Sequence, residues 1–502
     1  MRPRIVGSLF SIWARRRLQS VEALVRRAPE AQAETLEALL ATARETTFGR
    51  EHGFSGIRSH ADFARNVPVR RYVETLPWLH RVLRGEENVT WPGRARWFAK
   101  TSGTTAGDKA IPVTDALVAQ NRRAGRDVLA YHVRSTPGSR LFEGELLFLG
   151  GSTTMEGLPA GGQVGDLSGI MTAEMPFWLR RRVRPSPGVV AIRDWELKLE
   201  AIARETLGRD LKLLSGMPSW SLLLFERWRA LSGGRSPADL FPGLELFVHG
   251  GVRYEPYRET LETSFGRALR RLEVYPASEG FLAVQDDPGS VGMVLGLDYG
   301  TFYEFVPAAE AGSPSARRLT LAEVRVGETY SIVLSNVAGL WAYEIGDLVR
   351  FASIAPPRVT VVGRTTAFSN CCGENLIVEE VEEAFVAACA ETGATAGEFT
   401  VAARHGAVAD GRPRLEWVVE SADPAFPSEA FARAADAVLR RRNHDYDTKR
   451  TGDVGMLPPV VALVPPGTFH SWMRSLGKLG GQHKVPRLRN DRDVADALLA
   501  AA

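Results

Sequence analysis

The sequence predicts an α/β protein of more than one domain, and three observations lead to this prediction. The chain has 502 residues, a length that permits two or three domains. In its first half, short apolar strands run into glycine turns and are followed by helices, which is typical of an α/β domain with ligand loops at the strand ends. Beyond about residue 365, helices and strands alternate over the length of a compact α+β domain.

The elements of the N-terminal part are predicted from their periodicity. Apolar residues recur at helical spacing over Leu18–Glu45 and again over Asp115–Val133, and both segments are predicted to be helices. A mixed segment broken by two prolines lies between them, over Gly49–Gly93. The compact apolar run Glu145–Leu149, which two glycines follow, is predicted to be a strand.

The middle of the chain continues the same alternation. Helical patterns over Ala201–Leu231 are interrupted near Gly216. Leu244–Val248 is predicted to be a buried strand that runs into the triplet His249-Gly-Gly251. A helix over Tyr257–Leu269 and a short strand over Leu272–Tyr275 are expected next.

The pattern of predicted secondary structure changes after residue 291. Short strands separated by turns predict a β-rich subdomain or barrel, with strands over Gly292–Leu297, Thr301–Val306, Ala322–Val326 and Tyr330–Ser335. After Gly363-Arg364 the order helix, strand, strand, helix, strand, helix is expected. The predicted fold is therefore a large N-terminal α/β domain with a β-rich, barrel-like subdomain, and a smaller C-terminal α+β domain.

Composition and charge exclude several classes of function. The 62 basic and 59 acidic residues leave a net charge of +3, which gives no electrostatic footprint for nucleic acid. The three cysteines, Cys371, Cys372 and Cys389, fit neither a disulfide framework nor a zinc site, and they favour a reducing cytoplasm. We therefore expect a cytoplasmic protein.

The N-terminal segment is short and flanked by arginines. Ile5–Ala14 is apolar, has basic residues on both sides and fits poorly with a signal peptide. An ordinary first helix is favoured over contact with a membrane surface. The chain has no run of about 18 apolar residues, so we expect no membrane span.

The most informative motif is the loop that follows Phe98. In Thr101-Ser-Gly-Thr-Thr105 and on to Lys109, glycines and hydroxyl side chains are compressed into one segment. Consecutive backbone N–H groups in such a loop form a nest that suits a polyphosphate. Three residues separate Gly103 from Gly107, and Ala110 follows the lysine, so the loop is not of the Walker type. Read alone, a run of Gly, Ser and Thr is more often a surface turn, and that alternative is favoured until the motifs further along the chain are considered.

Two carboxylates follow strands further along the chain. Glu279, after Tyr275-Pro-Ala-Ser278, is suited to hold Mg²⁺, a hard cation that prefers oxygen ligands. Asp347, after Gly346, is suited to bind both hydroxyls of a ribose. The alternatives are a solvated glutamate at a strand end and a hairpin aspartate.

Two cationic residues complete the set. Arg364 opens the segment Gly363–Glu382, which is also typical of a domain linker before a helix. Lys484 lies in the glycine-flanked segment Gly480–Arg487 and is suited to reach into a site as a mobile point charge. The alternative for this last segment is a flexible basic tail.

In this order the motifs resemble those of the adenylate-forming superfamily, which contains acyl-CoA ligases and peptide synthetase adenylation domains. The match is closer to one branch, the auxin-conjugating (Gretchen Hagen) family of acyl acid–amido synthetases. The segments that carry the closer resemblance are Thr101-Ser-Gly-Thr-Thr105, Lys109-Ala-Ile-Pro112, Tyr303-Glu-Phe-Val-Pro307, Gly339-Leu-Trp-Ala-Tyr343 and Gln482-His-Lys-Val-Pro-Arg487, with Thr47-Phe-Gly-Arg50 and Gly467-Thr-Phe469 as framework.

The resemblance implies an activity and its cofactors. Such enzymes activate a carboxylic acid with ATP and Mg²⁺, release pyrophosphate and pass the acyl group to an amino acid. It implies that Lys484 and Glu279 act in catalysis and that Glu279 holds the metal. The residues implied to bind the nucleotide are Ser102, Gly103, Thr104, Thr105, Tyr254, Tyr275, Ala277, Ser278, Glu279, Tyr343, Asp347, Arg364 and Lys484.

The resemblance also implies how the domains are divided. A large domain over residues 1–363 binds ATP and the acid, a hinge lies at 364–366, and a small mobile domain covers 367–502. We expect a monomer. An acyl-CoA ligase, which shares the first half-reaction, is the alternative function.

The chain departs from the family pattern at three positions: Glu344 stands where plant members have arginine, Asn370 where relatives in the wider superfamily often have lysine, and Ala277 where a small polar residue is usual. The acid is expected to lie between the first helix of the large domain and the strand Leu244–Val248. The candidates for the walls of this pocket are Phe148, Phe177, Trp178, Met217, Trp220 and Tyr254, and plain core packing is the alternative for each. His249, just before Gly250-Gly251, is a candidate to contact the nucleotide or the acyl group, and a satisfied histidine at a strand end is the alternative.

Overall fold

The computed structural model describes residues 3–101, 109–150, 155–159, 161–175, 177–192, 194–313, 315–365, 368–369, 376–404, 413–451, 456–479, 484–489 and 491–502. The chain divides into two compact units. Unit 1 contains Met1–Ile345, Val349–Thr360 and Gly480–Gln482, and unit 2 contains Gly346–Leu348, Val361–Leu479 and His483–Ala502. The hinge at 364–366 stays a prediction.

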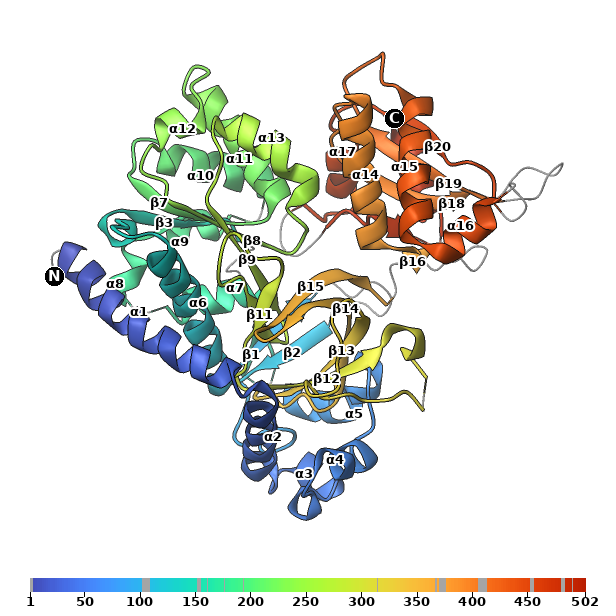
Figure 1. Ribbon diagram of the computed structural model, residues 1–502. Coiled ribbons are helices and arrows are strands. Elements are labelled where there is room, and N and C mark those ends of the chain that lie inside the picture. The colour runs from blue at the N-terminus through green and yellow to red at the C-terminus, as the bar shows by residue number, and fades with distance from the viewer. Residues whose placement is uncertain are drawn as a thin grey trace. The chain divides into compact units, whose positions relative to one another are not determined.

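Two helices begin the chain (Figure 1). Helix α1 covers Pro3–Val25, which confirms the ordinary first helix expected over Ile5–Ala14, and α2 covers Ala28–Ala43, so the continuous helix predicted over Leu18–Glu45 is wrong in its bounds. Pro29 lies in the first turn of α2, where its missing N–H costs nothing, and it starts a new helix. Ala14 and Leu18 of α1 are buried in the core of unit 1.

Short helices follow, and one glycine among them is sterically required. They are α3 (Thr47–Glu51), the 3₁₀ turn η1 (Phe54–Gly56), α4 (His60–Asn66) and α5 (Tyr72–Leu83). A Cβ on Gly49 would lie 2.2 Å from the carbonyl oxygen of Ala43. This close approach explains the glycine in Thr47-Phe-Gly-Arg50.

Unit 1 contains a small four-stranded sheet in the order β2-β1-β5-β4. Its strands are β1 (Trp97–Thr101), β2 (Lys109–Val113), β4 (Glu156–Gly157) and β5 (Gln163–Gly165). β1 and β2 are antiparallel, and Thr101 lies opposite Lys109. The long helix α6 (Asp115–Ser135) follows β2, close to its predicted bounds.

A second sheet has eleven strands in the order β12-β13-β14-β15-β11-β10-β9-β8-β7-β3-β6. Strands β6, β3, β7, β8 and β9 are parallel, and β9, β10, β11 and β15 pair in antiparallel fashion. The bounds are β3 Glu145–Phe148, β6 Val183–Arg184, β7 Leu211–Ser215, β8 Leu246–Gly250, β9 Arg271–Ala277, β10 Gly280–Val284, β11 Met293–Leu295, β12 Thr301–Pro307, β13 Thr329–Asn336, β14 Tyr343–Ile354 and β15 Pro357–Arg364.

Helices connect these strands. They are η2 (Leu141–Glu143), α7 (Leu167–Ala173), α8 (Phe177–Arg180), α9 (Pro187–Val190), α10 (Trp195–Thr206), α11 (Pro218–Leu231), α12 (Pro237–Leu240), η3 (Glu255–Tyr257), α13 (Arg258–Phe265) and η4 (Ala308–Glu310). α13 ends earlier than predicted because Gly266 takes the left-handed conformation, with φ of +100°.

Two strand predictions fail. The sequence did not indicate β7, because its five-residue apolar run has no period that distinguishes a buried strand from a helix. The strand expected over Ala322–Val326 is a series of turns. The prediction of an α/β fold with a β-rich part is confirmed, and the antiparallel strands extend the parallel sheet.

Unit 2 is an α+β domain with its own core. Its four-stranded sheet has the order β20-β19-β18-β21, with β18 Phe399–Arg404, β19 Arg414–Glu420, β20 Val460–Val464 and β21 Leu488–Arg489. The strands β16 (Phe368–Ser369) and β17 (Leu376–Ile377) pair separately. The helices are α14 (Val378–Thr392), α15 (Ser428–Arg442), α16 (His444–Arg450), α17 (Thr468–Ser475) and α18 (Asp493–Ala501).

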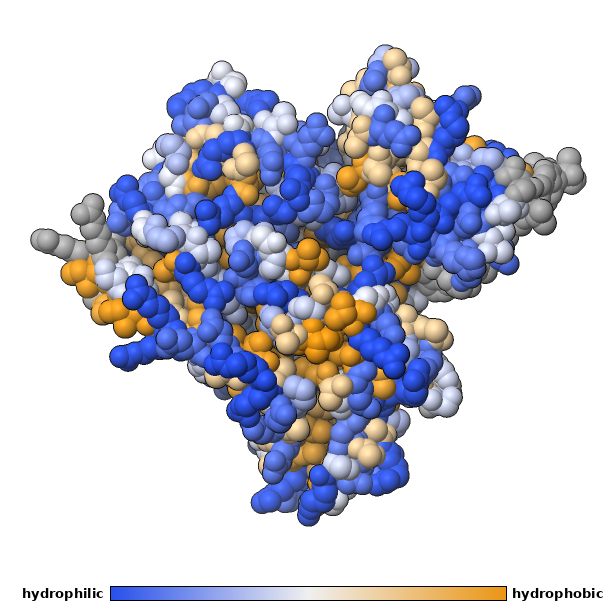
Figure 2. All heavy atoms as spheres, in the orientation of Figure 1, coloured by the Kyte–Doolittle hydropathy of each residue, from blue (hydrophilic) through white to orange (hydrophobic). Residues whose placement is uncertain are grey.

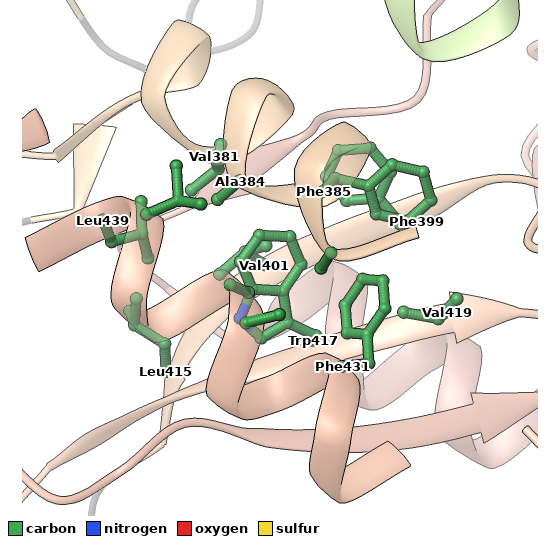
Figure 3. Packing of buried hydrophobic residues seen from close by; sticks show 14 of the residues in the cluster. Val381, Ala384, Phe385, Phe399, Val401, Leu415, Trp417, Val419, Phe431 and Leu439 are labelled. Carbon is green, nitrogen blue, oxygen red and sulfur yellow. The ribbon is translucent and has the colours of Figure 1, made fainter. Parts of the chain in front are cut away.

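Aromatic rings fill the core of unit 2 (Figure 3). Phe399 stacks on Phe385 of α14 with ring centroids 4.0 Å apart, and Trp417 and Phe431 pack beside them. All four side chains are 3 % exposed or less. The core therefore joins α14 firmly to β18.

The first turns of α1 carry exposed apolar residues, visible beside the N-terminus in Figure 2. Ile5, Leu9 and Ile12 are each about half exposed, and Arg15 and Arg16 follow on the surface. Among the described residues, no helix is long and apolar enough to cross a membrane.

Candidate active site

A tight hairpin between β9 and β10 carries the carboxylate that the sequence analysis singled out. Ala277 pairs with Gly280, so Ser278 and Glu279 form a two-residue turn between the strands. Both turn residues are buried, at 4 % and 7 % exposed. Burying a carboxylate costs free energy unless it has partners, and Glu279 has such partners. Its burial at the tip of a hairpin therefore makes Glu279 a candidate functional residue of unit 1.

Asn336, which the sequence analysis missed, holds this hairpin in place. Its side chain is fully buried at the end of β13, and Nδ2 donates a 2.6 Å hydrogen bond to the backbone oxygen of Glu279. Its Oδ1 accepts a hydrogen bond from the N–H of Ala338. Nothing in the sequence places residue 336 near residue 279, since the contact depends on the tertiary fold.

His249 and Tyr275 lie on one face of the sheet, near the carboxyl ends of β8 and β9. His249 pairs with Glu273, and because side chains alternate along strands, it shares a face with Phe247 and Tyr275. His249 is 2 % exposed, and neither of its ring nitrogens has a hydrogen-bond partner among the described residues. Its ring lies 4.9 Å from that of Tyr254. Ligands of α/β sheets bind at this end of the strands.

His249 is neutral at physiological pH. Burial, together with the positive charge of Arg271, lowers the pKa of His249 to about 3. The neutral imidazole has one donor and one acceptor, neither of them used within the described residues. An orphaned buried polar group of this kind fits a ligand with both a donor and an acceptor.

The buried histidine makes the protein sensitive to acid. An unfolded histidine binds a proton below about pH 6.5, whereas folded His249 does not until about pH 3, so stability falls as the pH falls between these values. We expect the free energy of unfolding, from urea titration, to fall by about 2 kcal/mol less between pH 7 and pH 5 in His249→Gln than in the parent. The exposed His80 serves as the control, because His80→Gln should leave this pH dependence unchanged. An equal loss in the parent and His249→Gln would contradict the assignment.

Gly250 allows β8 to approach β9 closely. A Cβ at this position would lie 2.3 Å from the carbonyl oxygen of Val274, so the strands would have to separate. This approach also explains why β8 runs through His249 and Gly250, two residues beyond the predicted strand end.

Substitution of Gly250 should therefore destabilise unit 1. We expect Gly250→Ala to lower the free energy of unfolding by roughly 3 kcal/mol, measured by urea titration. Gly125→Ala in α6 is the matched control, because a Cβ there meets no atom within 4 Å and alanine favours the helix. Equal stability of the two variants would show that β8 and β9 separate without cost.

The predicted ribose motif lies at the start of β14. Tyr343 is fully buried, and Nε of Arg364 in β15 donates a 2.8 Å hydrogen bond to Oδ1 of Asp347. The structure thus brings the predicted residues Asp347 and Arg364 together as an ion pair. The hydrogen-bonded arginine orients the carboxylate of Asp347.

Glu344, the departure from the plant pattern, has partners of its own. Its carboxylate accepts a hydrogen bond from Oγ of Ser331 at 2.9 Å and pairs with Nε of Arg71 at 3.1 Å. The charge that replaces an arginine here is therefore compensated by Arg71. Glu304, in the motif Tyr303-Glu-Phe-Val-Pro307, is also buried, where it forms an ion pair with Arg318 and a hydrogen bond with Nε2 of His60, so that motif is framework.

The predicted phosphate loop lies outside the described residues, and with it Ser102, Gly103, Thr104 and Thr105. Its flanks are described. Lys109 lies with its Nζ 5.6 Å from the ring centroid of Tyr72, whose hydroxyl accepts a hydrogen bond from the N–H of Ala110.

The candidate pocket residues do not form one wall. Phe148 pairs in register with Ser215, which pairs with Val248, and this face of the sheet packs its core against α1 and α6. His249 and Tyr254 belong to the opposite face. The space expected between the first helix and β8 is thus filled by packed side chains.

Two other candidates lie at the start of α11. Trp220 is buried in α11, 4.8 Å from the ring of Trp195, and Met217 precedes α11. The side chains of Phe177 and Trp178 lie outside the described residues.

Lys484 belongs to unit 2 and is exposed. The charges that act on its ammonium group within this unit are those of Asp347, Arg364 and Glu382. Glu382 is buried in α14 and was not among the predicted site residues. Its role could not be found from the sequence, because it lies 102 positions from Lys484.

The described residues contain no cluster of three or more side chains that could hold a metal ion by themselves. Mg²⁺ in phosphoryl-transfer sites is commonly bound by one or two carboxylates together with the phosphates of the substrate. The buried carboxylate of Glu279 fits that mode of binding.

The comparisons with known proteins cover most of the chain. The GH3 family N-terminal domain matches residues 17–194, the central domain matches 294–364 and the C-terminal domain matches 379–493. A probable indole-3-acetic acid-amido synthetase from Oryza sativa subsp. japonica is 24% identical over 96% of this chain and 90% of its own length. An indole-3-acetic acid-amido synthetase from Arabidopsis thaliana is 23% identical over 94% and 91%.

Solved structures share the fold. An acyl acid amido synthetase in complex with 2,4-DB superposes with a TM-score of 0.78 at 19% identity, over 95% of each chain. A 2-hydroxyisobutyryl-CoA ligase in its postadenylation state superposes with a TM-score of 0.60 at 16% identity, over 95% of this chain and 92% of the other. The expected resemblance is confirmed by the three ordered domain matches: the chain belongs to the GH3 family.

Proposed function

We propose that this chain is an ATP-dependent acyl acid–amido synthetase. It adenylates a carboxylic acid, releases pyrophosphate and transfers the acyl group to the amine of an amino acid. The observation that carries the proposal is the match of all three GH3 family domains, in order, along one chain. Two structural observations also support it: the burial of Glu279 in its hairpin, and the ion pair between Asp347 and Arg364.

In the first half-reaction, a carboxylate oxygen of the acid attacks the α-phosphorus of ATP and pyrophosphate leaves. We propose that the loop with Ser102, Gly103, Thr104 and Thr105 binds the phosphates and that Asp347 binds the ribose. Lys484 offsets the negative charge that builds up on the reacting phosphate. Mg²⁺ held by Glu279 would supply further neutralisation of the phosphate oxygens.

The adenine is assigned to the face that carries Tyr275. Tyr275 and Tyr254 are proposed to contact the base, with Ala277 and Ser278 lining its edge and Tyr343 close to the ribose. His249 offers one donor and one acceptor on the same face. Adenine and the polar groups of the acid can both pair with one hydrogen-bond donor and one acceptor.

In the second half-reaction, the amine attacks the acyl carbonyl. The carbon–nitrogen bond forms, the bond between the carbonyl carbon and the phosphate oxygen breaks, AMP leaves, and the amine loses a proton. No covalent intermediate with the protein is required. Met217 and Trp220 are proposed to contact the apolar part of the acid.

An acyl-CoA ligase is the second candidate, because the CoA ligase that superposes on this chain has the same fold. The fold therefore does not choose between an amine and a thiol as acceptor, whereas family membership favours the amine. The low number of cysteines, three in the chain, supports a cytoplasmic setting. The monomer stays a prediction.

Acid-dependent exchange between ATP and pyrophosphate tests the first half-reaction. Relatives and a solved structure name indole-3-acetic acid, jasmonate and 2,4-DB, so a library of aromatic, jasmonate-like and fatty acids should include them. We expect exchange with at least one acid and none without acid. No exchange with any acid, at saturating ATP and Mg²⁺, would contradict the proposed function.

A further inference from the structure

We propose that Arg487 is a positioning residue that fixes Lys484 on the C-terminal domain. This inference rests on the proposed function, because Lys484 is there the cation of the adenylation step. Every contact used below lies within unit 2.

Arg487 is buried and bound on several sides. It is 7 % exposed, and its Nη1 donates a 2.8 Å hydrogen bond to the carbonyl of Phe399 and lies 2.7 Å from Oε2 of Glu398. Its Nε lies 4.0 Å from Oε1 of Glu382. The guanidinium therefore joins the start of β18 to α14.

The guanidinium also lies against the aromatic core. Its carbon is 4.5 Å from the ring centroid of Phe399, and that ring stacks on Phe385 (Figure 3). A planar guanidinium is suited to bind two carboxylates and a carbonyl while it stacks on a ring, which the ammonium group of lysine is not. Arg487 thus lies directly against the buried aromatic core of the domain.

The segment between Arg487 and Lys484 is short and stiff. Pro486 restricts Val485 to extended conformations, so the position of Arg487 is transmitted to Lys484 over about 10 Å. Oγ1 of Thr400 donates a 2.6 Å hydrogen bond to the carbonyl of Pro486, and the N–H of Val401 donates one to the carbonyl of Arg487. Val485 packs against a second apolar cluster of the domain.

Charge connects the two residues as well. Glu382 acts electrostatically on Lys484 and lies beside Arg487. Arg487, with its Nε 4.0 Å from Oε1 of Glu382, compensates part of the negative charge of that carboxylate. An arginine three residues after the lysine therefore controls both its place and its electrostatic surroundings.

The test compares Arg487→Lys with Arg492→Lys. Arg492 is a matched control, because it pairs with Glu416 at 2.6 Å and bonds the carbonyl of Ala403 in the same domain, yet lies outside the segment of Lys484. We expect Arg487→Lys to slow acid-dependent exchange 10- to 100-fold. Amide formation from supplied acyl adenylate should change less than about 3-fold, and Arg492→Lys should change both steps less than about 3-fold.

Two further measurements separate positioning from simple stability. In a Lys484→Ala background, Arg487→Lys should lower exchange by less than about 2-fold, since it acts through Lys484. Hydrogen exchange at the amide of Val401, which is bonded to the carbonyl of Arg487, should be faster in Arg487→Lys and unchanged in Arg492→Lys. If Arg487→Lys lowers the yield of folded protein, Thr400→Val is used in its place. It removes the hydrogen bond to the carbonyl of Pro486, loosens the same segment and should slow acid-dependent ATP–pyrophosphate exchange several-fold.

Three results would overturn the proposal. The first is an equal loss of rate in both half-reactions for Arg487→Lys. The second is a loss of ATP–pyrophosphate exchange in the Lys484→Ala background as large as in the parent. The third is an unchanged rate of hydrogen exchange at the Val401 amide. The last readout needs no activity. Absence of exchange in the parent would contradict the proposed function, while the Val401 amide would still decide whether Arg487 fixes the segment.

Discussion

Replacement of Lys484 by alanine is expected to slow acid-dependent ATP–pyrophosphate exchange by roughly 10³-fold, since a preorganised charge-stabilising group contributes on the order of 10² to 10³ in rate. Amide formation from supplied acyl adenylate should change less than about 3-fold, because the charge on the α-phosphate has already been relieved when that step begins. The two steps are measured separately, by isotope exchange and by product formation from synthetic acyl adenylate.

Lys478→Ala is the matched control for this variant. Lys478 is an exposed lysine six residues before Lys484 in the same unit, and both rates should stay at the parental level. Equal losses in the two steps for Lys484→Ala would assign this lysine to acyl binding or to folding in place of adenylation.

Glu279→Gln is expected to have the second large effect. The amide keeps the size of the side chain and leaves the backbone oxygen that Asn336 binds, so the hairpin should persist. It removes the negative charge that suits Mg²⁺. We expect exchange to fall on the order of 10²-fold and to require a higher Mg²⁺ concentration for half-maximal rate.

Glu310→Gln provides the comparison, because Glu310 pairs with Arg317 at the surface and should leave both quantities unchanged. Thermal unfolding of the two variants separates catalysis from stability. An unchanged Mg²⁺ dependence in Glu279→Gln would remove Glu279 from the metal site, even if the rate falls.

Local sequence signals predicted those parts of the fold that local physics determines. Asp115 began α6 as predicted. Gly266, which ends α13 earlier than predicted, is also a local signal, since a glycine at a helix C-terminus acts over one helical turn. The strand β7 was missed because burial on both faces erases the alternation that marks a strand. The extension of β8 through Gly250 depends on the carbonyl of Val274, which no local pattern contains.

The candidate site follows the same division. Glu279, Asp347 and Arg364 could be predicted as site residues because glycine turns and strand ends accompany them in the sequence. The structure shows that Asp347 and Arg364 form an ion pair. Asn336, Glu382 and Arg487 act by holding other residues, and their partners lie 57, 102 and 88 positions away. Such supporting contacts are long-range, so even where the residue lies in a quoted motif, as Arg487 does, the sequence does not show its partner.

The central claim is that the activated acyl group is delivered to an amine. The most direct measurement incubates the enzyme with ATP, Mg²⁺, an acid that supports exchange, a mixture of amino acids and an equal concentration of CoA, and identifies the products by mass spectrometry. We expect the acyl amide of one or a few amino acids, formed together with AMP and only in the presence of ATP. Formation of the acyl-CoA thioester alone would contradict it.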